Sequence, residues 1–118
     1  MGKYWSDAEL IVAVYFTSRG FTEAAVSQIL HARGFRRSYD AVYRKIKDIR
    51  NKHPVLQAKD QDWDINAVDL WLDELSLDHQ TVNHLICCSD LEATIAAKHG
   101  VAESILEKLE RSNWRWMA

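Results

Sequence analysis

The chain has 118 residues, carries a formal net charge of −2, and is 47% hydrophobic and 27% charged. This length suits one domain, or a small domain with an appended segment, and the composition is ordinary for a soluble globular protein. No apolar run approaches the roughly 20 residues of a membrane span, and the N-terminal residues lack the apolar core of a secretion signal. We therefore expect an intracellular protein without membrane contact. Because the sequence holds one proline, four glycines and little strand-like alternation, we predict an all-α fold.

The charged residues are divided unevenly along the chain. Residues 1–53 contain ten Lys and Arg against five Asp and Glu, whereas residues 54–118 contain five against twelve. The first half thus has a balance of +5 and the second half a balance of −7. Such an asymmetry is typical of a protein that offers a nucleic-acid surface on one side.

Two helices are predicted in the first 34 residues. Ser6 can cap the first helix, and Glu9, three residues later, completes a capping box. This helix is expected to end near Gly20. Thr22 can cap the second helix, which should run to Gly34, because glycine commonly follows the last turn of a helix.

The third predicted helix, within residues 36–53, is the most informative segment of the chain. Ser38 is a good N-cap, and Pro54 ends the helix. One face is expected to be buried, since apolar positions recur at helical spacing at Val42, Ile46, Ile49 and His53. A different face carries Tyr43, Lys47, Arg50 and Asn51. Three helices joined by short turns are typical of a helix-turn-helix arrangement, and a helix with such a polar face can enter a DNA major groove.

Further helices are expected in the acidic half of the chain. A fourth helix should begin at Asp64, with an apolar side formed by Ile65, Val68, Leu72 and Leu75 and an acidic side formed by Asp69, Asp73 and Glu74. A fifth helical segment is expected at about residues 78–88. Ser89 or Asp90 can cap a last helix that extends from Leu91 to Leu109, with a possible break at Gly100.

Residues 5–10 (Trp-Ser-Asp-Ala-Glu-Leu), Gly20 and residues 37–46 (Arg-Ser-Tyr-Asp-Ala-Val-Tyr-Arg-Lys-Ile) resemble a Myb/SANT-like domain. The resemblance covers about residues 4–53, and residues 53–54 and 63–72 look like the continuation found in a Myb-like domain of filamentous fungi. The resemblance implies a three-helix, homeodomain-like fold whose third helix enters the DNA major groove. Carried over by position, the base-reading residues of this family fall on Tyr43, Arg44 and Lys47.

The function predicted on these grounds is DNA binding by a nuclear transcriptional or chromatin regulator. We expect the base-facing residues to be Tyr43, Arg44, Lys47, Arg50 and Asn51. Phosphate contacts are expected from Arg36, Arg37 and Lys52, because basic residues near the ends of a reading helix lie beside the DNA backbone. The alternative is a SANT-type module that binds a histone or adaptor protein instead of DNA. The two differ in whether the acidic fourth helix covers the basic face of the third.

The predicted organisation has three parts. Residues 1–54 form the Myb/SANT-like domain, residues 55–76 form a connector and the acidic fourth helix packed on it, and residues 77–118 form a helical extension. The extension has more apolar positions than a three-helix domain needs to cover. It is therefore expected either to cap the domain or to bind a protein partner or a second copy of the chain, through Leu106, Leu109, Trp114 and Trp116.

No catalytic or metal-binding pattern stands out. The chain lacks a Ser-His-Asp order, a glycine-rich phosphate loop and a His-Glu-x-x-His motif, so we expect no enzyme, no cofactor and no small-molecule substrate. The spacing of His79, His84, Cys87, Cys88 and His99 does not match common zinc sites, and no metal is expected. Cys87 and Cys88 are expected to be reduced thiols.

Overall fold

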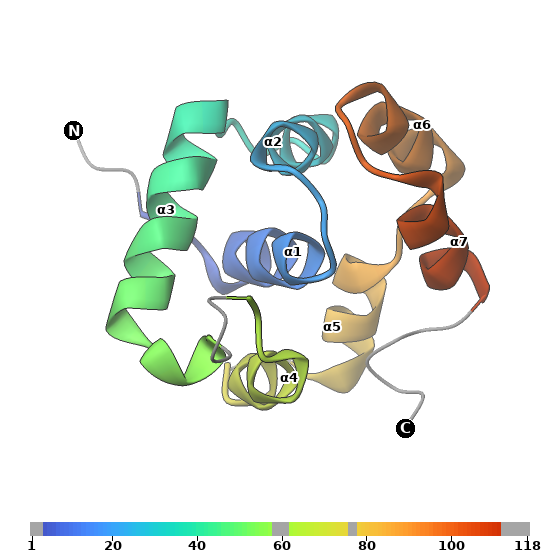
Figure 1. Ribbon diagram of the computed structural model, residues 1–118. Coiled ribbons are helices and arrows are strands. Elements are labelled where there is room, and N and C mark those ends of the chain that lie inside the picture. The colour runs from blue at the N-terminus through green and yellow to red at the C-terminus, as the bar shows by residue number, and fades with distance from the viewer. Residues whose placement is uncertain (1–3, 58–61, 76–77, 112–118) are drawn as a thin grey trace.

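The computed structural model describes residues 4–57, 62–75 and 78–111 (Figure 1). These residues contain seven α-helices and no strand, which confirms the predicted all-α class. The helices are α1 (Asp7–Ser18), α2 (Glu23–Ala32), α3 (Tyr39–Lys52), α4 (Ile65–Asp73), α5 (His79–Ile86), α6 (Asp90–Lys98) and α7 (Glu103–Arg111), with a short 3₁₀ turn, η1 (Pro54–Leu56), after α3. In the described part of the chain, no helix has both the length and the apolar character needed to cross a bilayer.

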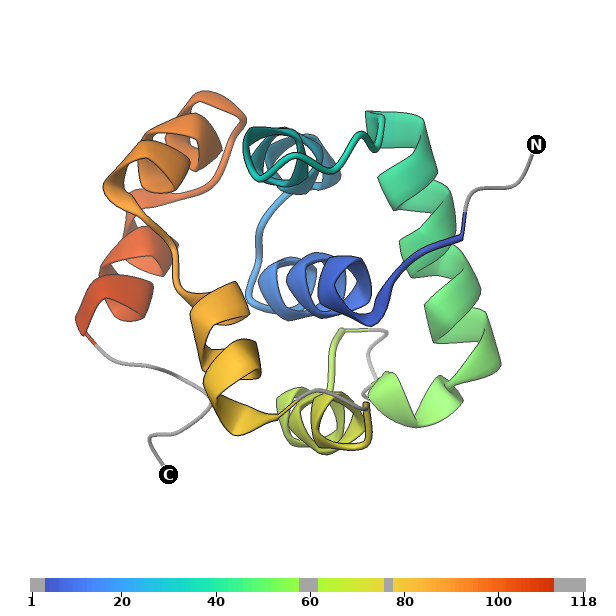
Figure 2. The ribbon, with the colours of Figure 1, turned by 180° about the vertical axis from the view of Figure 1, so that it is seen from behind.

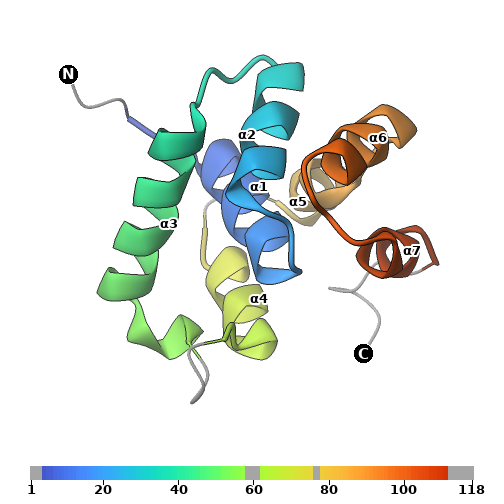
Figure 3. The ribbon, with the colours of Figure 1, turned by 45° about the horizontal axis from the view of Figure 1, so that its top comes forward.

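Helix α1 occupies the centre of the molecule (Figure 1, Figure 3). Every residue from Ile11 to Ser18 is buried, because the sequence is apolar on all sides of the helix. The helix packs against α2, α3, α4 and α5. Ser6 and Glu9 form the predicted capping box at its start, and Gly20 follows its end with a φ of +104°. The other helices are thus arranged around one buried apolar rod.

The helices of the acidic half join the same core as the first three helices. Helix α5 packs against α1, and α6 packs against α2. Their buried apolar residues belong to a single cluster with those of α1–α3, and this cluster includes Val82, Ile86, Ala96 and Val101. Arg33, at the end of α2, donates hydrogen bonds to the Glu92 carboxylate and to the carbonyls of Leu85 and Cys87. This contact joins the end of α2 to the α5–α6 junction.

The prediction of which α4 residues form its buried apolar side is partly wrong. Val68 and Leu72 are fully buried and Leu75 packs against the core, but Ile65 is 37% exposed. Ile65 is the first residue of the helix, directly after its N-cap Asp64, and it lies at the edge of the packed face. Trp71, on the same helix, is half-buried against the core.

The last predicted helix is two helices. Gly100 has a φ of +92°, a conformation that glycine adopts without a steric penalty, and it separates α6 from α7. Leu91, expected on the apolar side, is 66% exposed in the first turn of α6. Because the chain turns at Gly100, the apolar positions before and after it do not form one continuous stripe.

The start of α7 lies against Gly20. A β-carbon at Gly20 would come within 2.7 Å of the Ile105 Cδ1 atom, whereas a β-carbon at Gly34 would meet no atom within 4 Å. Both glycines have positive φ, so alanine at either position should cost about 1–2 kcal/mol in backbone strain. We expect Gly20→Ala to cost about 1 kcal/mol more than Gly34→Ala in urea unfolding, because Ile105 must leave its preferred packing.

Removing the Ile105 Cδ1 atom provides the control for this comparison. In an Ile105→Val background, Gly20→Ala and Gly34→Ala should destabilise the protein equally. A difference that persists in this background would show that α7 does not rest on Gly20 in solution.

Candidate nucleic-acid interface

Helix α3 lies at one edge of the molecule, with α6 and α7 on the opposite side of α1 (Figure 1, Figure 2). Its inner face buries Val42, Ile46 and Ile49, as predicted, because these residues recur every three or four positions. His53, expected on the same face, is exposed: it is the C-cap residue, where the backbone leaves the helical path, and its ring lies 5.8 Å from that of Trp71. The buried stripe therefore ends at Ile49.

The outer face of α3 exposes most of the residues predicted to face bases. Tyr43 is 46% exposed, the Arg44 side chain is 78% exposed, and Lys47 and Asn51 are also exposed. Together with Glu23, the acidic first residue of α2, and the Gln57 side chain, Tyr43, Lys47 and Asn51 line an open hollow of about 420 Å³. This surface offers amine and amide groups beside a phenol ring, all on one side of one helix.

The acidic helix α4 does not cover this outer face. It packs on α1 and η1, and the Asp69 carboxylate binds the Arg19 guanidinium at 2.9 Å, at the C-terminal end of α1. Arg19 is buried and also lies over the Tyr15 ring, 4.2 Å from its centroid. This acidic group of α4 is thus turned toward the core helix and away from Lys47.

Arg37, predicted to contact phosphate, is a structural residue instead. Its Nε donates to a Glu9 carboxylate oxygen, its Nη2 donates to the Tyr4 carbonyl, and its guanidinium lies 4.5 Å from the Trp5 ring centroid. Its side chain is only 9% exposed. The ion pair holds the start of α3 against the start of α1, so this guanidinium is not available to DNA.

The pKa of Glu9 reflects this arrangement. Burial raises the pKa, but the hydrogen bonds from Arg37 and Ser6 outweigh burial, and the net pKa lies below the ordinary carboxyl value. Glu92 behaves in the same way: burial raises its pKa, and hydrogen bonds from Arg33 and Ser89 lower it further than burial raises it. Both carboxylates therefore contribute stability in their charged form.

Arg50, predicted to face bases, turns toward the connector before α4. Its guanidinium lies 4.5 Å from the Trp63 ring centroid, and its Nη2 donates to the Asp62 carbonyl at 3.4 Å. The residue is half-buried. It borders the hollow beside Lys47, but its stacking on Trp63 removes it from the outermost surface of α3.

The remaining predicted basic contacts are solvated. Arg36 is exposed just before α3 begins. Arg44 pairs with Asp40 at 3.1 Å and Lys52 pairs with Asp48 at 3.3 Å, both across one helical turn on an open surface. Such exposed ion pairs contribute little to the stability of the fold, typically about 0.3–0.5 kcal/mol. A DNA phosphate can therefore replace the carboxylate as the partner of Arg44 or Lys52.

Tyr39 belongs to this surface and was not among the predicted site residues. It is 54% exposed, and its ring is stacked on that of Tyr43 with centroids 6.5 Å apart and planes 6° apart. The two residues are four positions apart on α3, a spacing that brings side chains together on a helix. That spacing is the signal in the sequence that points to this pair.

The predicted partner-binding residues are only partly described. Leu106 is half-buried against the protein's own core. The side chain of Leu109, and all of Trp114 and Trp116, lie outside the described residues, so association through them stays a prediction.

In the part of the chain that the structure covers, no group of three or more His, Cys, Asp or Glu side chains could hold a metal ion. Of the two cysteine thiols, Cys87 is exposed and Cys88 is half-buried.

Comparison with known proteins leaves the family open. Searches of protein-family models, curated proteins and solved structures returned no match to this chain. The Myb/SANT-like resemblance therefore stays a prediction, and the function is argued from the geometry and charge of the surface itself.

Proposed function

We propose that this protein binds double-stranded DNA as a non-enzymatic module of a nuclear regulator, with the outer face of α3 in the major groove. The observation that carries the proposal is the exposure of Tyr43, Arg44, Lys47 and Asn51 on one helix face that the acidic helix α4 leaves open. An α-helix fits the width of the major groove, where base edges present hydrogen-bond donors and acceptors. The helix-turn-helix order of α1–α3 is consistent with this placement.

The chemistry of the outer face suits base edges. The Lys47 ammonium can donate to the O6 and N7 acceptors of guanine, and the Asn51 amide can pair with adenine through one donor and one acceptor. The Arg44 guanidinium can reach either a guanine or a phosphate. The stacked Tyr39 and Tyr43 rings lie beside these groups, where they can contact thymine methyl groups or sugars.

Affinity is expected to come mainly from phosphate contacts at both ends of α3. Arg36 lies before the helix and Lys52 in its last turn, where they would meet the DNA backbone on either side of the groove. The acidic helix α4 packs on α1 and η1 and not on the outer face of α3, and α6 lies across α1 from α3 (Figure 1). This separation of charge would orient the molecule with α3 toward the polyanion.

The salt dependence of binding tests this proposal. With Arg37 used inside the fold, Arg36, Lys52 and Arg44 remain for phosphates, so the plot of log affinity against log salt should have a slope of about −2 to −3. Fluorescence anisotropy of a labelled random duplex across a salt series measures the slope. An affinity that does not change with salt, or no binding at low salt, would contradict the proposal.

A second candidate is a SANT-type module that binds a histone or an adaptor protein. The exposed Tyr39–Tyr43 pair favours it, because aromatic side chains are enriched at protein interfaces. The basic face of α3 would suit an acidic adaptor segment better than a basic histone tail. Pull-down with histone-tail peptides and with an acidic peptide, each in competition with the duplex, would distinguish these partners from DNA.

A further inference from the structure

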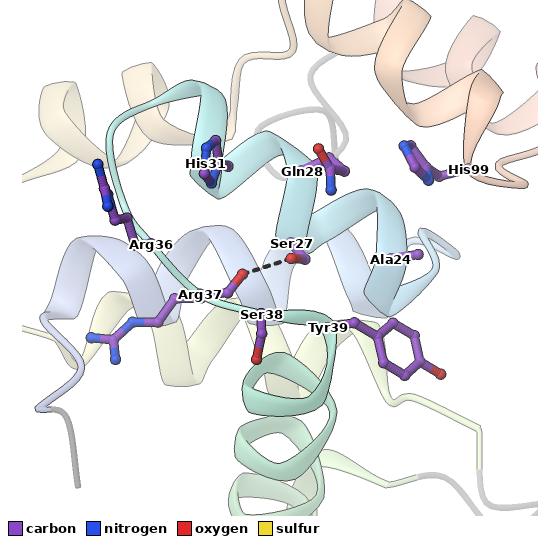
Figure 4. A pocket seen from close by; sticks show the side chains of 9 residues that line it. All are labelled: Ala24, Ser27, Gln28, His31, Arg36, Arg37, Ser38, Tyr39 and His99. Atoms are coloured by element: carbon purple, nitrogen blue, oxygen red, sulfur yellow. Dashed lines mark hydrogen bonds between the residues drawn. The ribbon is translucent and has the colours of Figure 1, made fainter. Parts of the chain in front are cut away.

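A second hollow lies beside the first turn of α3, on the side that faces α2 and the α6–α7 turn (Figure 4). Its volume is about 370 Å³, and no carboxylate lines it. The nine lining residues come from three parts of the chain: Ala24, Ser27, Gln28, His31, Arg36, Arg37, Ser38, Tyr39 and His99. The C-terminal half of the protein therefore contributes to a hollow that borders the predicted DNA-reading helix.

Three of the lining polar residues are engaged in the fold. The Ser27 hydroxyl donates to the Arg37 carbonyl at 2.6 Å, and the Ser38 hydroxyl accepts the Ala41 amide at 3.1 Å as the N-cap of α3. The Arg37 guanidinium points away from the hollow, toward Glu9 (Figure 4). These groups shape the wall of the hollow and are not free to bind a ligand.

The other polar side chains of the hollow all carry hydrogen-bond donors. They are Gln28, His31, Arg36, Tyr39 and His99, and each of these residues is exposed. Within the described residues, none of them uses a polar side-chain atom in a hydrogen bond or an ion pair. The nearest carboxylate in the sequence, that of Asp40, is turned to Arg44. The hollow thus concentrates donors and positive charge without a compensating anion.

The position of His99 is fixed by the fold. Its carbonyl accepts a hydrogen bond from the Thr22 hydroxyl at 2.7 Å, and the same hydroxyl accepts the Ala25 amide at 3.1 Å as the N-cap of α2. Helix α6 also packs along α2. The backbone of His99 is therefore held at the rim of the hollow by a contact between residues 77 positions apart.

We infer that this hollow binds a phosphate group, which is a backbone phosphodiester of the same DNA duplex that α3 contacts. The inference rests on the proposed function. A phosphodiester carries one negative charge and several acceptor oxygens, which matches an Arg guanidinium, an amide, a phenol and two imidazoles around one space. Tyr39 lines the hollow and stacks on Tyr43, so the hollow is continuous with the outer face of α3. The DNA footprint then extends across α2 to the α6–α7 turn.

Charge variants at the hollow test the inference in duplex binding. Arg36→Gln should make the salt slope less steep by about 1, and Arg36→Lys should restore it, because the slope counts neutralised phosphates. His31→Glu and His99→Glu should each weaken duplex binding by at least about threefold, by placing a carboxylate beside the phosphodiester. His84→Glu is the matched control: like His31, His84 is exposed in the last turn of its helix, but it lies on α5. It should leave the affinity within about twofold of wild type.

A direct probe separates this inference from the proposed function. Titration of the free protein with inorganic phosphate should shift the NMR signals of the His31 and His99 rings and of the Gln28 amide, and Arg36→Gln should abolish these shifts. If the duplex binds but neither the hollow variants nor phosphate has an effect, the inference is overturned and α3 remains the interface. If phosphate shifts these signals but no duplex binds, the DNA proposal is overturned, and the hollow would instead serve a smaller phosphorylated molecule.

Discussion

Lys47→Glu is expected to weaken binding to duplex DNA by at least about tenfold at moderate salt. Lys47 is exposed at the middle of the outer face of α3, where a base contact is worth about 1–3 kcal/mol and a carboxylate would face the acceptor-rich groove. The substitution should not affect folding, because the side chain takes part in no described hydrogen bond or ion pair. Fluorescence anisotropy with one labelled duplex measures the change, and circular dichroism confirms that the helices are retained.

A matched control removes the effect of total charge. Gln80→Glu combined with Thr81→Glu makes the same change of −2 in net charge, but on exposed residues of α5, across α1 from α3 (Figure 2). This variant should bind within about threefold of wild type, since charges separated by more than a Debye length are largely screened. Equal losses in both variants would mean that binding responds to net charge alone and that α3 has no special part in it.

Glu9→Gln is expected to lower the free energy of unfolding by about 3 kcal/mol at neutral pH. The Glu9 and Arg37 side chains are 8% and 9% exposed, so removing one charge leaves the other buried without its partner. The substitution also weakens the capping box of α1. Urea unfolding measures the change. Glu74→Gln, on an exposed carboxylate, is the control and should stay within about 0.5 kcal/mol of wild type.

The same residue should appear in the pH dependence of stability. Because the folded-state pKa of Glu9 lies below that of the unfolded chain, its contribution is fully present above the unfolded pKa of about 4.3 and is lost as the pH falls through the folded-state pKa. Wild type should therefore lose stability below about pH 4.5, and Glu9→Gln should lose less over the same interval. Glu92 accounts for part of the remaining loss, since its pKa is lowered as well. Identical pH curves for wild type and Glu9→Gln would contradict the role given to the ion pair.

Helix positions could be predicted well from the sequence because their signals are local. Ser6, Thr22, Ser38 and Ser89 were each identified as possible N-caps, and each accepts a backbone amide within its own first turn. Asp64 was expected to begin the fourth helix, and it is the N-cap of α4. The buried stripe of α3 followed from the spacing of three apolar residues. The outer face of α3 followed from the same geometry for Tyr43, Lys47 and Asn51, whereas Arg44 was added by the family resemblance.

The role of individual arginines could not be predicted, because it depends on partners far away in the sequence. Arg37 pairs with Glu9 across 28 residues, and Arg33 pairs with Glu92 across 59. Both arginines were counted among the ten basic residues of residues 1–53. Arg50 was assigned to the outer face by helical periodicity alone, whereas its long side chain reaches back to Trp63. Periodicity gives the direction of a Cβ atom, but a guanidinium several bonds away can reach a neighbouring element.

The set of residues that line the hollow beside the first turn of α3 could not be predicted from the sequence either. Nothing in the spacing of His31, Arg36 and His99 indicates that they line one hollow, because the α6–α7 turn reaches α2 only through the folded core. The exposure of Leu91 and Ile65 could not be predicted from the sequence either. Both fit an apolar pattern, yet each lies in the first turn of its helix, where the packed face has not begun.

Mapping the contact surface by NMR would show whether the outer face of α3 binds DNA. ¹⁵N-labelled protein titrated with an unlabelled duplex at low salt reports, residue by residue, which amides change their surroundings. We predict the largest shifts within residues 36–52, together with the Asn51 side-chain amide, and small shifts in α5. Shifts confined to α4–α7, with α3 unchanged, would contradict the claim that the outer face of α3 binds DNA.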